Sequence, residues 1–378
     1  MNKLNIIALN IIRSLATPIF NFLITIIGVM ALGKYRWGDF VQIILWIYLF
    51  VFISNFGNRD FLIRSFSKSP SKIDSLFFTN LSSRSILLVL SLVFLIIFPL
   101  KTALLSVLLG LSIFLYQSLE SLVIYFQKFI VQIVAESVGL LIIVGSILFY
   151  NNLDTNLLLL IYCISFWIKT FLILYDLNLN YKAFKFHFSY AQIKESLPFF
   201  LIGFSGWLAS KADIYMVNIM LTKEQLTEYQ LLMTAILFLQ GIAAYIIYPF
   251  TKHMYRLPLK FFNRAKRILG LVSVPIIVLF TVITWFVYEE IIELNIPQSH
   301  YILGALLSLP YYFFLIDIIA LYKINKEISV MYVNFGSAIV NIVLTLLLIP
   351  IFEVMGALVS VLVIQYSKLF LYKSKLIR

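Results

Sequence analysis

Four ionisable side chains interrupt long apolar stretches of this sequence, far from the ends of those stretches. Three are cations, Arg13, Lys169 and Lys211, and one is a carboxylate, Asp213. An ionisable group near the centre of a lipid bilayer costs at least about 2.5–3.5 kcal/mol, so it is a functional candidate by default. Because the cations outnumber the carboxylate, a cavity that they line attracts an anion, and cations of this kind bind pyrophosphate groups.

A polar helix face surrounds the first of these cations. In the stretch 8–31, polar side chains that include Arg13 and Asn21 recur at steps of three and four residues, which places them on one face of a helix. A polar face in lipid needs a water-filled cavity or a polar partner helix. We expect this face to line a substrate cavity. The alternative is that Arg13 extends to the cytoplasmic headgroups while the other residues only pack.

The stretch 197–220 has two different faces. Trp207, Lys211 and Tyr215 share one face, whereas Asp213 belongs to a face of small residues suited to close helix packing. Lys211 lies about 14 residues, or roughly 20 Å, into the stretch. We predict that the aromatic rings stack on sugars while the cations take up pyrophosphate charge. The alternative for Lys211 is a buried salt bridge to a distant carboxylate.

Three carboxylates, Glu120, Glu136 and Asp317, fall in the cytoplasmic third of their apolar stretches and are candidates for ion coupling. Glu120 and Glu136 flank one predicted hairpin at similar depth, so they could share a proton. They could equally pair with Lys128. The sequence leaves both alternatives open.

The composition excludes a soluble protein. Of the 378 residues, 62% are hydrophobic and only 12% are charged, whereas soluble domains carry about 25% charged residues. Soluble enzymes, nucleic-acid binders and secreted modules are therefore excluded. The single cysteine, Cys163, lies in an apolar stretch, so we expect no disulfide framework and no metal cluster.

The apolar stretches predict an all-α polytopic membrane protein with twelve transmembrane helices. We expect an N-terminal lobe at 1–176, a cytoplasmic linker at 177–196 and a C-terminal lobe at 197–378, related by a pseudo-two-fold axis. Shifting the sequence by half its length aligns Lys34 with Lys223, which supports the repeat. The predicted helices are near 8–31, 40–57, 85–99, 103–125, 129–150, 157–175, 197–220, 229–250, 268–288, 301–322, 328–350 and 354–372.

The basic residues predict the orientation of these helices. With both termini in the cytoplasm, 23 of the 29 lysines and arginines lie in cytoplasmic pieces and four lie in outside loops, as the positive-inside rule requires. The net charge of +12 is thus a matter of topology, and we expect no nucleic-acid partner. The basic loop at 252–267 has the same explanation.

Several short motifs resemble polysaccharide repeat-unit (O-antigen type) flippases of the multidrug/oligosaccharidyl-lipid/polysaccharide exporter superfamily. The similarity extends over the whole chain, but the motifs are loose and shared across the superfamily. Two departures are Thr227-Glu228 before Tyr229 and Phe352 to Val354 before Gly356, where the family usually has glycine. The motifs are Leu32-Gly33-Lys34 through Gly38-Asp39, Ser196-Leu197-Pro198 followed by Asp213 and Tyr229, and Asn341 to Pro350 followed by Gly356-Ala357.

The resemblance implies a protein of the bacterial cytoplasmic (inner) membrane that is not an enzyme. Such a protein moves an undecaprenyl-pyrophosphate-linked oligosaccharide from the cytoplasmic to the outer leaflet by alternating access. It is coupled to a proton or sodium gradient as the energy source and has no cofactor. The cationic cavity residues of the family map onto Arg13 and Lys211. The implied partners are this substrate, membrane lipids and polysaccharide polymerase machinery, with the chain as a monomer. The lack of a thirteenth and fourteenth span argues against a peptidoglycan-precursor flippase.

Two alternatives remain. A multidrug or cation antiporter of the same fold is disfavoured by the few acidic residues at depth. A membrane polysaccharide polymerase or glycosyltransferase generally needs a large extracytoplasmic loop, and the longest predicted outside loop, near 289–300, is too small.

Overall fold

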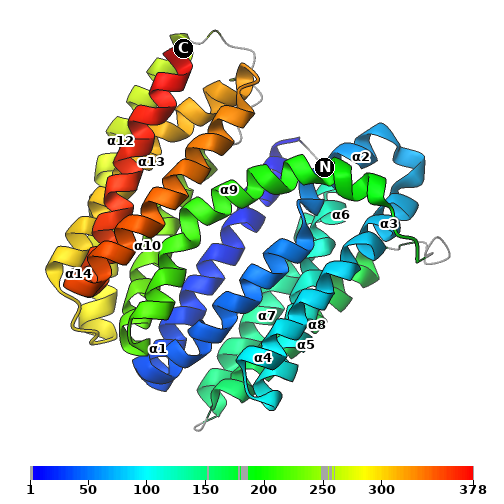
Figure 1. The fold of residues 1–378 in the computed structure, drawn as a ribbon, viewed down its shortest axis with the longest axis horizontal. Coiled ribbons are helices and arrows are strands. Elements are labelled where there is room, and N and C mark those ends of the chain that lie inside the picture. The colour runs from blue at the N-terminus through cyan, green and yellow to red at the C-terminus, as the bar shows by residue number, and fades with distance from the viewer. Residues whose placement is uncertain are drawn as a thin grey trace. The chain divides into compact units, whose positions relative to one another are not determined.

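The computed structural model describes residues 3–150, 153–177, 179, 186–247, 254, 258 and 260–377, and the regular elements of these residues are all helical (Figure 1). The chain divides into two compact units, Met1–Gly203 and Phe204–Arg378. The expected linker at 177–196 falls partly outside the described residues. The expected lobe boundaries and the pseudo-two-fold relation stay predictions.

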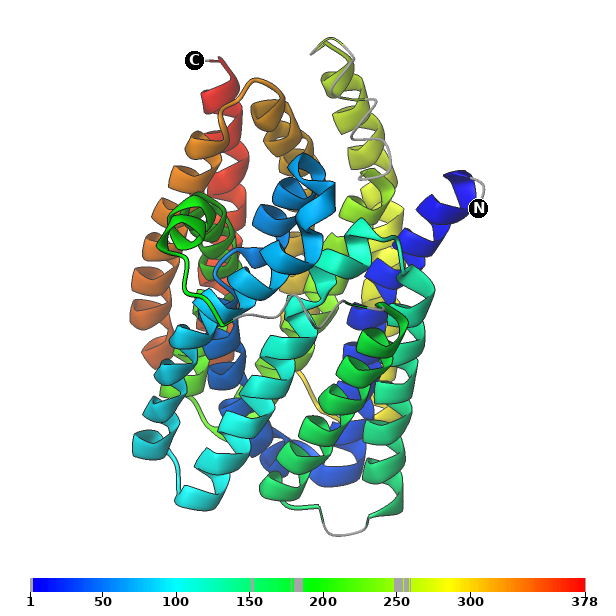
Figure 2. The same ribbon diagram turned by 90° about the vertical axis from the view of Figure 1, so that its right-hand side faces the viewer.

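The N-terminal unit is a bundle built around α1, α5, α7 and α8. α1 packs against α5 and α7, and α8 packs against both α5 and α7; Figure 2 shows α7 and α8 side by side. The helices of this unit are α1 (Lys3–Asn55), α2 (Asn58–Lys68), the 3-10 helix η1 (Pro70–Lys72), α3 (Ile73–Ser85), the 3-10 helix η2 (Ile86–Val93), α4 (Phe94–Ile97), α5 (Leu100–Ser118), α6 (Glu120–Tyr125), α7 (Phe129–Phe149), α8 (Thr155–Leu177) and the first part of α9 (Tyr190–Met220).

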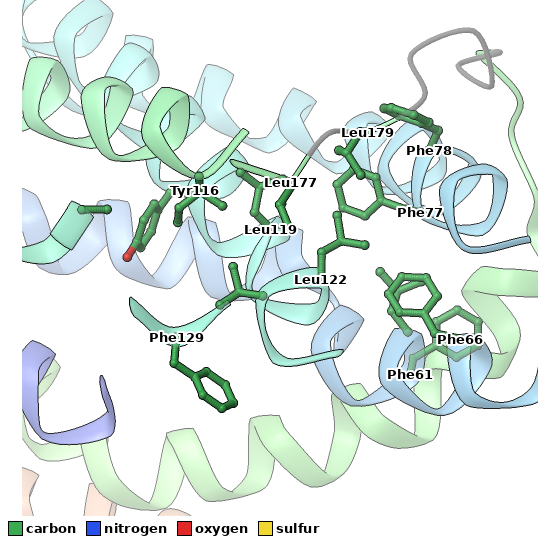
Figure 3. Packing of buried hydrophobic residues seen from close by; sticks show 14 residues of the cluster. Phe61, Phe66, Phe77, Phe78, Tyr116, Leu119, Leu122, Phe129, Leu177 and Leu179 are labelled. Atoms are coloured by element: carbon green, nitrogen blue, oxygen red, sulfur yellow. The ribbon is translucent and has the colours of Figure 1, made fainter. Parts of the chain in front are cut away.

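One apolar cluster joins the short helices of this unit to its long ones (Figure 3). Phe66 of α2, Phe77 of α3, Leu122 of α6 and Leu177 of α8 are members of the cluster. Burying a large apolar side chain of this kind stabilises a fold by about 1.5–3 kcal/mol. The cluster therefore fixes α2, α3 and α6 against α8. This matters for the site because α6 begins with Glu120, one of the predicted ion-coupling carboxylates.

α1 contains a break where the sequence predicts a turn between two helices. Gly33 has φ +78° and ψ 160°, which is not helical and which glycine adopts without the penalty of a Cβ atom. Around this break, Gly28 lies against the indole ring of the buried Trp37. A glycine is needed at position 28 because a Cβ atom there would lie 2.1 Å from a ring carbon of Trp37.

The stretch 85–99, which the sequence predicts as a regular span, has an unusual structure. Residues Ile86–Val93 form a 3-10 helix and only Phe94–Ile97 return to α-helix. Runs of 3-10 helix longer than three or four residues are uncommon because their hydrogen-bond geometry is poorer. Val89, Leu92 and Ile96 are exposed, as expected for side chains that face lipid.

The described part of the C-terminal unit comprises the rest of α9 and five further helical elements. α13 packs along α14 and α12, and α10 packs against α13. Leu239, Phe262, Tyr312 and Ile316 lie in the apolar core that these helices share. The elements are α10 (Lys223–Ile247), α12 (Lys260–Phe286), the π-helix η5 (Val287–Ile291), α13 (Gln298–Lys323) and α14 (Glu327–Ile377).

α14 is broken at Glu353, which has φ +50° and ψ −129°. This position lies between the predicted helices 328–350 and 354–372. The Gln225 side chain donates a hydrogen bond to the Glu353 carboxylate at 2.5 Å. A non-glycine residue with positive φ is uncommon, so the turn depends on support of this kind.

The helices identify a multi-pass membrane protein. Within the described residues, nine stretches are long and apolar enough to cross a bilayer. Two of these, 9–68 and 327–376, contain the breaks at Gly33 and Glu353. The predicted span 197–220 lies in α9, which is not among the nine. The all-helical membrane fold is confirmed, while the count of twelve and the cytoplasmic termini stay predictions.

The contact between Gly28 and Trp37 predicts the effect of a single methyl group. We expect Gly28→Ala to lower the free energy of unfolding by about 1–3 kcal/mol because it overpacks a buried site. The melting temperature of the purified protein measures this. Gly145→Ala is the matched control, since a Cβ atom at Gly145 has no neighbour within 4 Å among the described residues. In a Trp37→Leu background, which removes the ring, the further loss from Gly28→Ala is expected to be small. An unchanged melting temperature for Gly28→Ala in the wild-type background would contradict the contact.

Candidate functional site

The polar groups of the N-terminal unit gather where α1 meets α6 and α7. The Arg13 guanidinium donates hydrogen bonds to Asn10 Oδ1 at 3.2 Å, Glu120 Oε1 at 3.3 Å and Gln132 Oε1 at 3.1 Å. Arg59 Nη1 lies 3.6 Å from the same Glu120 oxygen. The Arg13 side chain is only 9% exposed, so its charge is compensated by a carboxylate from a distant part of the chain.

The second cation of this unit, Lys169 of α8, has a closer partner. Its Nζ lies 2.8 Å from Glu136 Oε2, and both side chains are 8% exposed. The hydroxyls of Tyr116 and Thr17 donate to Glu136 Oε1 at 2.6 and 3.3 Å. Gly139 makes this approach possible, because a Cβ atom there would lie 2.1 Å from Lys169 Cε.

The structure thus joins residues that the sequence assigns to two separate roles. The predicted substrate cations Arg13 and Lys169 hold the predicted ion-coupling carboxylates Glu120 and Glu136, one pair each. Lys128 pairs with Asp176 at 3.0 Å rather than with either glutamate. Neither cation of this unit is open to an anionic substrate while these pairs are formed.

Asn21 is exposed, and its backbone carbonyl accepts a hydrogen bond from the Thr25 hydroxyl at 2.8 Å. Arg13, Lys169 and Glu136, in contrast, are buried.

In the C-terminal unit, α9 carries both a cation and a carboxylate. Asp213 is buried and accepts a short hydrogen bond from the Tyr229 hydroxyl. Lys211 is half-buried, and no carboxylate among the described residues of its unit lies within ion-pair distance of it, although Asp213 is near enough to attract it. The rings of Trp207 and Tyr215 lie 5.5 Å apart on the same helix. Lys211 is thus the one predicted cation that the described part of its own unit leaves available, beside two aromatic rings.

The third predicted coupling carboxylate, Asp317 of α13, is held by a lysine. Lys266 Nζ lies 2.5 Å from Asp317 Oδ2. The Asp317 side chain is 9% exposed, and it contacts a different helix, α12, from those that hold Asp213. All three predicted coupling carboxylates therefore have a cation as partner.

A cavity of about 320 Å³ lies within the C-terminal unit. The cavity is lined by residues of α9, α10, α13 and α14. Asp213 of α9 and Lys368 of α14 are among these residues. Small residues of α9, such as Gly206 and Ser210, open the space. The sequence predicts close helix packing at this face of small residues, whereas the structure has a cavity there.

Sequence reasoning missed two buried cations, Arg84 and Lys368, which it assigned to cytoplasmic pieces. Arg84 is 0% exposed and donates to Asn80, Asn55 and Ser118 at 2.7 to 3.4 Å. Lys368 is 6% exposed. A signal for Lys368 was present, because positions 361, 365, 368 and 372 follow steps of four, three and four residues that form one helix face.

Comparisons with known proteins place the fold. No protein-family model matches the sequence, and no curated protein matches it either. Among solved structures, the lipid II flippase MurJ in an inward closed conformation is 13% identical, covers 97% of this chain and 88% of its own, and has a TM-score of 0.70. The chain shares the fold of this flippase.

Two further structures agree with this fold. The eukaryotic MATE transporter AtDTX14 is 14% identical, covers 99% of this chain and 95% of its own, and has a TM-score of 0.63. An inward-facing multidrug resistance MATE transporter of the MOP superfamily is 12% identical. The match covers 96% of this chain and 94% of the transporter, with a TM-score of 0.61. The chain thus shares its fold with these three proteins, as the sequence predicts, while the O-antigen type assignment stays a prediction.

The pair of Lys169 and Glu136 predicts a non-additive result. Removing one partner of a buried ion pair costs about 3–5 kcal/mol, whereas removing both charges is often close to neutral. We expect Glu136→Gln, which keeps an acceptor for Tyr116, to lower the melting temperature strongly, and Glu136→Gln with Lys169→Met to recover most of the loss. Additive losses in the double variant would show that the two charges do not depend on each other.

Proposed function

We propose that this protein is a flippase that moves an undecaprenyl-pyrophosphate-linked oligosaccharide from the cytoplasmic to the outer leaflet of the bacterial inner membrane. The observation that carries the proposal is Lys211, a half-buried cation beside Trp207 and Tyr215 whose own unit offers no carboxylate within ion-pair distance in its described part. An ammonium group there attracts the diphosphate, while flat aromatic surfaces suit the sugar that follows it. The MOP-type fold, which the lipid II flippase MurJ shares, supports a transporter rather than an enzyme.

The ion pairs suggest how transport is coupled to a gradient. Glu120, Glu136 and Asp317 each hold a cation, so protonating a carboxylate removes the attraction that keeps its cation in place. Release of Arg13 and Lys169 in this way makes them available to the anionic headgroup in one state only. In this proposal coupling is by proton uptake, and Glu136 is the carboxylate whose release matters most because it also accepts hydrogen bonds from Tyr116 and Thr17.

A MATE-like antiporter for cationic drugs is the second candidate. The fold likeness to two MATE transporters and the buried carboxylate of Asp213 in a cavity favour it. Against it stands Lys368, which lines the same cavity and repels a cationic ligand. Overexpression that increases efflux of cationic dyes would support this candidate.

The flippase proposal predicts a specific defect on loss of the Lys211 charge. In a strain that depends on this protein, we expect Lys211→Met to abolish surface polysaccharide and to accumulate the lipid-linked oligosaccharide, because the diphosphate loses its cation. Arg13→Ala is expected to do the same. Lys194→Met is the matched control, since Lys194 is an exposed lysine of the same helix.

Immunoblotting of the membrane fraction separates a transport defect from loss of the protein. Normal polysaccharide in Lys211→Met and Arg13→Ala at wild-type protein levels would overturn the assignment of these cations. A host that makes normal polysaccharide with no copy of this protein would overturn the flippase function itself.

A further inference from the structure

The cavity of the C-terminal unit contains two polar groups that the described residues do not satisfy. Lys368 is 94% buried and lines the cavity, yet it donates no hydrogen bond to a described side chain or carbonyl and has no ion-pair partner among them. Gln365, one turn before it on α14, also lines the cavity, and its buried Oε1 accepts no hydrogen bond within the described structure. A buried charge or amide without a partner is costly, so both groups need something that occupies the cavity.

Three other polar residues of the cavity each make one hydrogen bond within the described structure. Asp213 accepts from Tyr229, Asn334 accepts from the Tyr372 hydroxyl at 2.7 Å, and Gln240 donates to the Leu307 carbonyl at 3.4 Å. These bonds fix the orientation of the side chains without using all of their donors and acceptors. The cavity therefore presents a set of fixed polar groups of both kinds.

This mixture selects the chemistry of the occupant. A simple anion satisfies Lys368 but is repelled by Asp213, which is near enough to interact with Lys368 electrostatically. A simple cation satisfies Asp213 and Gln365 but is repelled by Lys368. A hydroxyl group both donates and accepts, so a ligand with several hydroxyls satisfies the lysine, the amide and the carboxylate together.

The aromatic wall of the cavity indicates which kind of hydroxyl-bearing ligand fits best. Tyr311 and Phe314 of α13 line it with their rings 5.2 Å apart, and Phe314 lies 5.5 Å from the ring of Tyr372. A sugar ring has an apolar face that packs against such rings while its hydroxyls bind polar groups at its edge. The volume of about 320 Å³ lies at the lower end of the range for small-molecule sites, which suits one or two sugar units.

We infer that this cavity is a binding site for a neutral pyranose, in which Lys368, Gln365 and Asp213 bind the hydroxyls and the α13 aromatic wall packs against the ring. As the site for one sugar of a transported oligosaccharide, it rests on the proposed function; as a sugar site alone, it does not. It involves neither Lys211 nor the ion pairs of the N-terminal unit.

A thiol-protection assay tests the site in the purified full-length protein. Cys163→Ala removes the single native cysteine, and Ser210→Cys places a reporter on the cavity wall. The rate of modification by the uncharged reagent methyl methanethiosulfonate is measured in a detergent without a sugar headgroup. The probes are glucose, galactose, N-acetylglucosamine and rhamnose, with inorganic phosphate, sodium and tetramethylammonium as the ionic comparisons.

We expect at least one of the four sugars to slow modification saturably, and none of the three ions to do so. Lys368→Met is expected to raise the sugar concentration needed by about tenfold or more, because a hydrogen bond from a charged donor is lost. Gln365→Leu is expected to weaken protection as well, and it decides the matter if Lys368→Met does not fold. Lys373→Met, on an exposed lysine of the same helix, is the control and should leave protection unchanged.

The following results of the protection assay each overturn the inference. Protection by phosphate alone indicates an anion site, protection by sodium or tetramethylammonium alone indicates a cation site, and no protection by any probe indicates a water-filled cavity. Protection that persists in both Lys368→Met and Gln365→Leu places the sugar elsewhere.

Sugar protection in a protein that fails to restore surface polysaccharide counts against the flippase function only, whereas restored polysaccharide without sugar protection counts against the sugar site only.

Discussion

Compensation of buried charge is the constraint on which the interior of this protein depends. A charged side chain in a lipid-embedded helical bundle has little water to bind, so a partner from another helix must replace it. Arg13 with Glu120 and Lys169 with Glu136 tie α1, α6, α7 and α8 together. The pair of Lys266 and Asp317 does the same for α12 and α13. The helices are thus held by a few specific contacts in addition to apolar packing.

Two buried cations are compensated in other ways, and the contrast is informative. Arg84 is surrounded by neutral acceptors from α1, α3 and α5, and its guanidinium lies 5.1 Å from the ring of Phe114. The delocalised charge of arginine tolerates such an environment better than an ammonium group does. Lys368 has no comparable set of acceptors in the described structure and lies at a cavity instead. Arg84 therefore has a structural role, whereas Lys368 depends on an occupant.

The sequence predicts the apolar helices and their breaks well, because these depend on local composition. Gly33 and the turn at Glu353 both fall where the apolar runs are interrupted. The partners of the charges were not predictable, since Arg13 and Glu120 are 107 residues apart and only the packing of α1 against its neighbours brings them together. The sequence predicts a cytoplasmic position for Lys368 because this lysine lies near the end of an apolar run. The helix face that it shares with positions 361, 365 and 372 indicates burial instead. The 3-10 structure of Ile86–Val93 has no signature in hydrophobicity, because it differs from an α-helix in backbone geometry alone.

The distribution of satisfied and unsatisfied groups gives the two units different physical characters. In the N-terminal unit, the buried cations Arg13 and Lys169 are bound by carboxylates, and changing that state requires a proton or another ion to compete for Glu120 or Glu136. In the C-terminal unit, Lys211 and Lys368 have no ion-pair partner within the described part of that unit, so water or a ligand is left to solvate them. Under the proposed function, a gradient acts most directly on the first unit, while substrate chemistry is recognised most directly by the second. This division between the two units depends on which buried charges were given a partner by the chain itself.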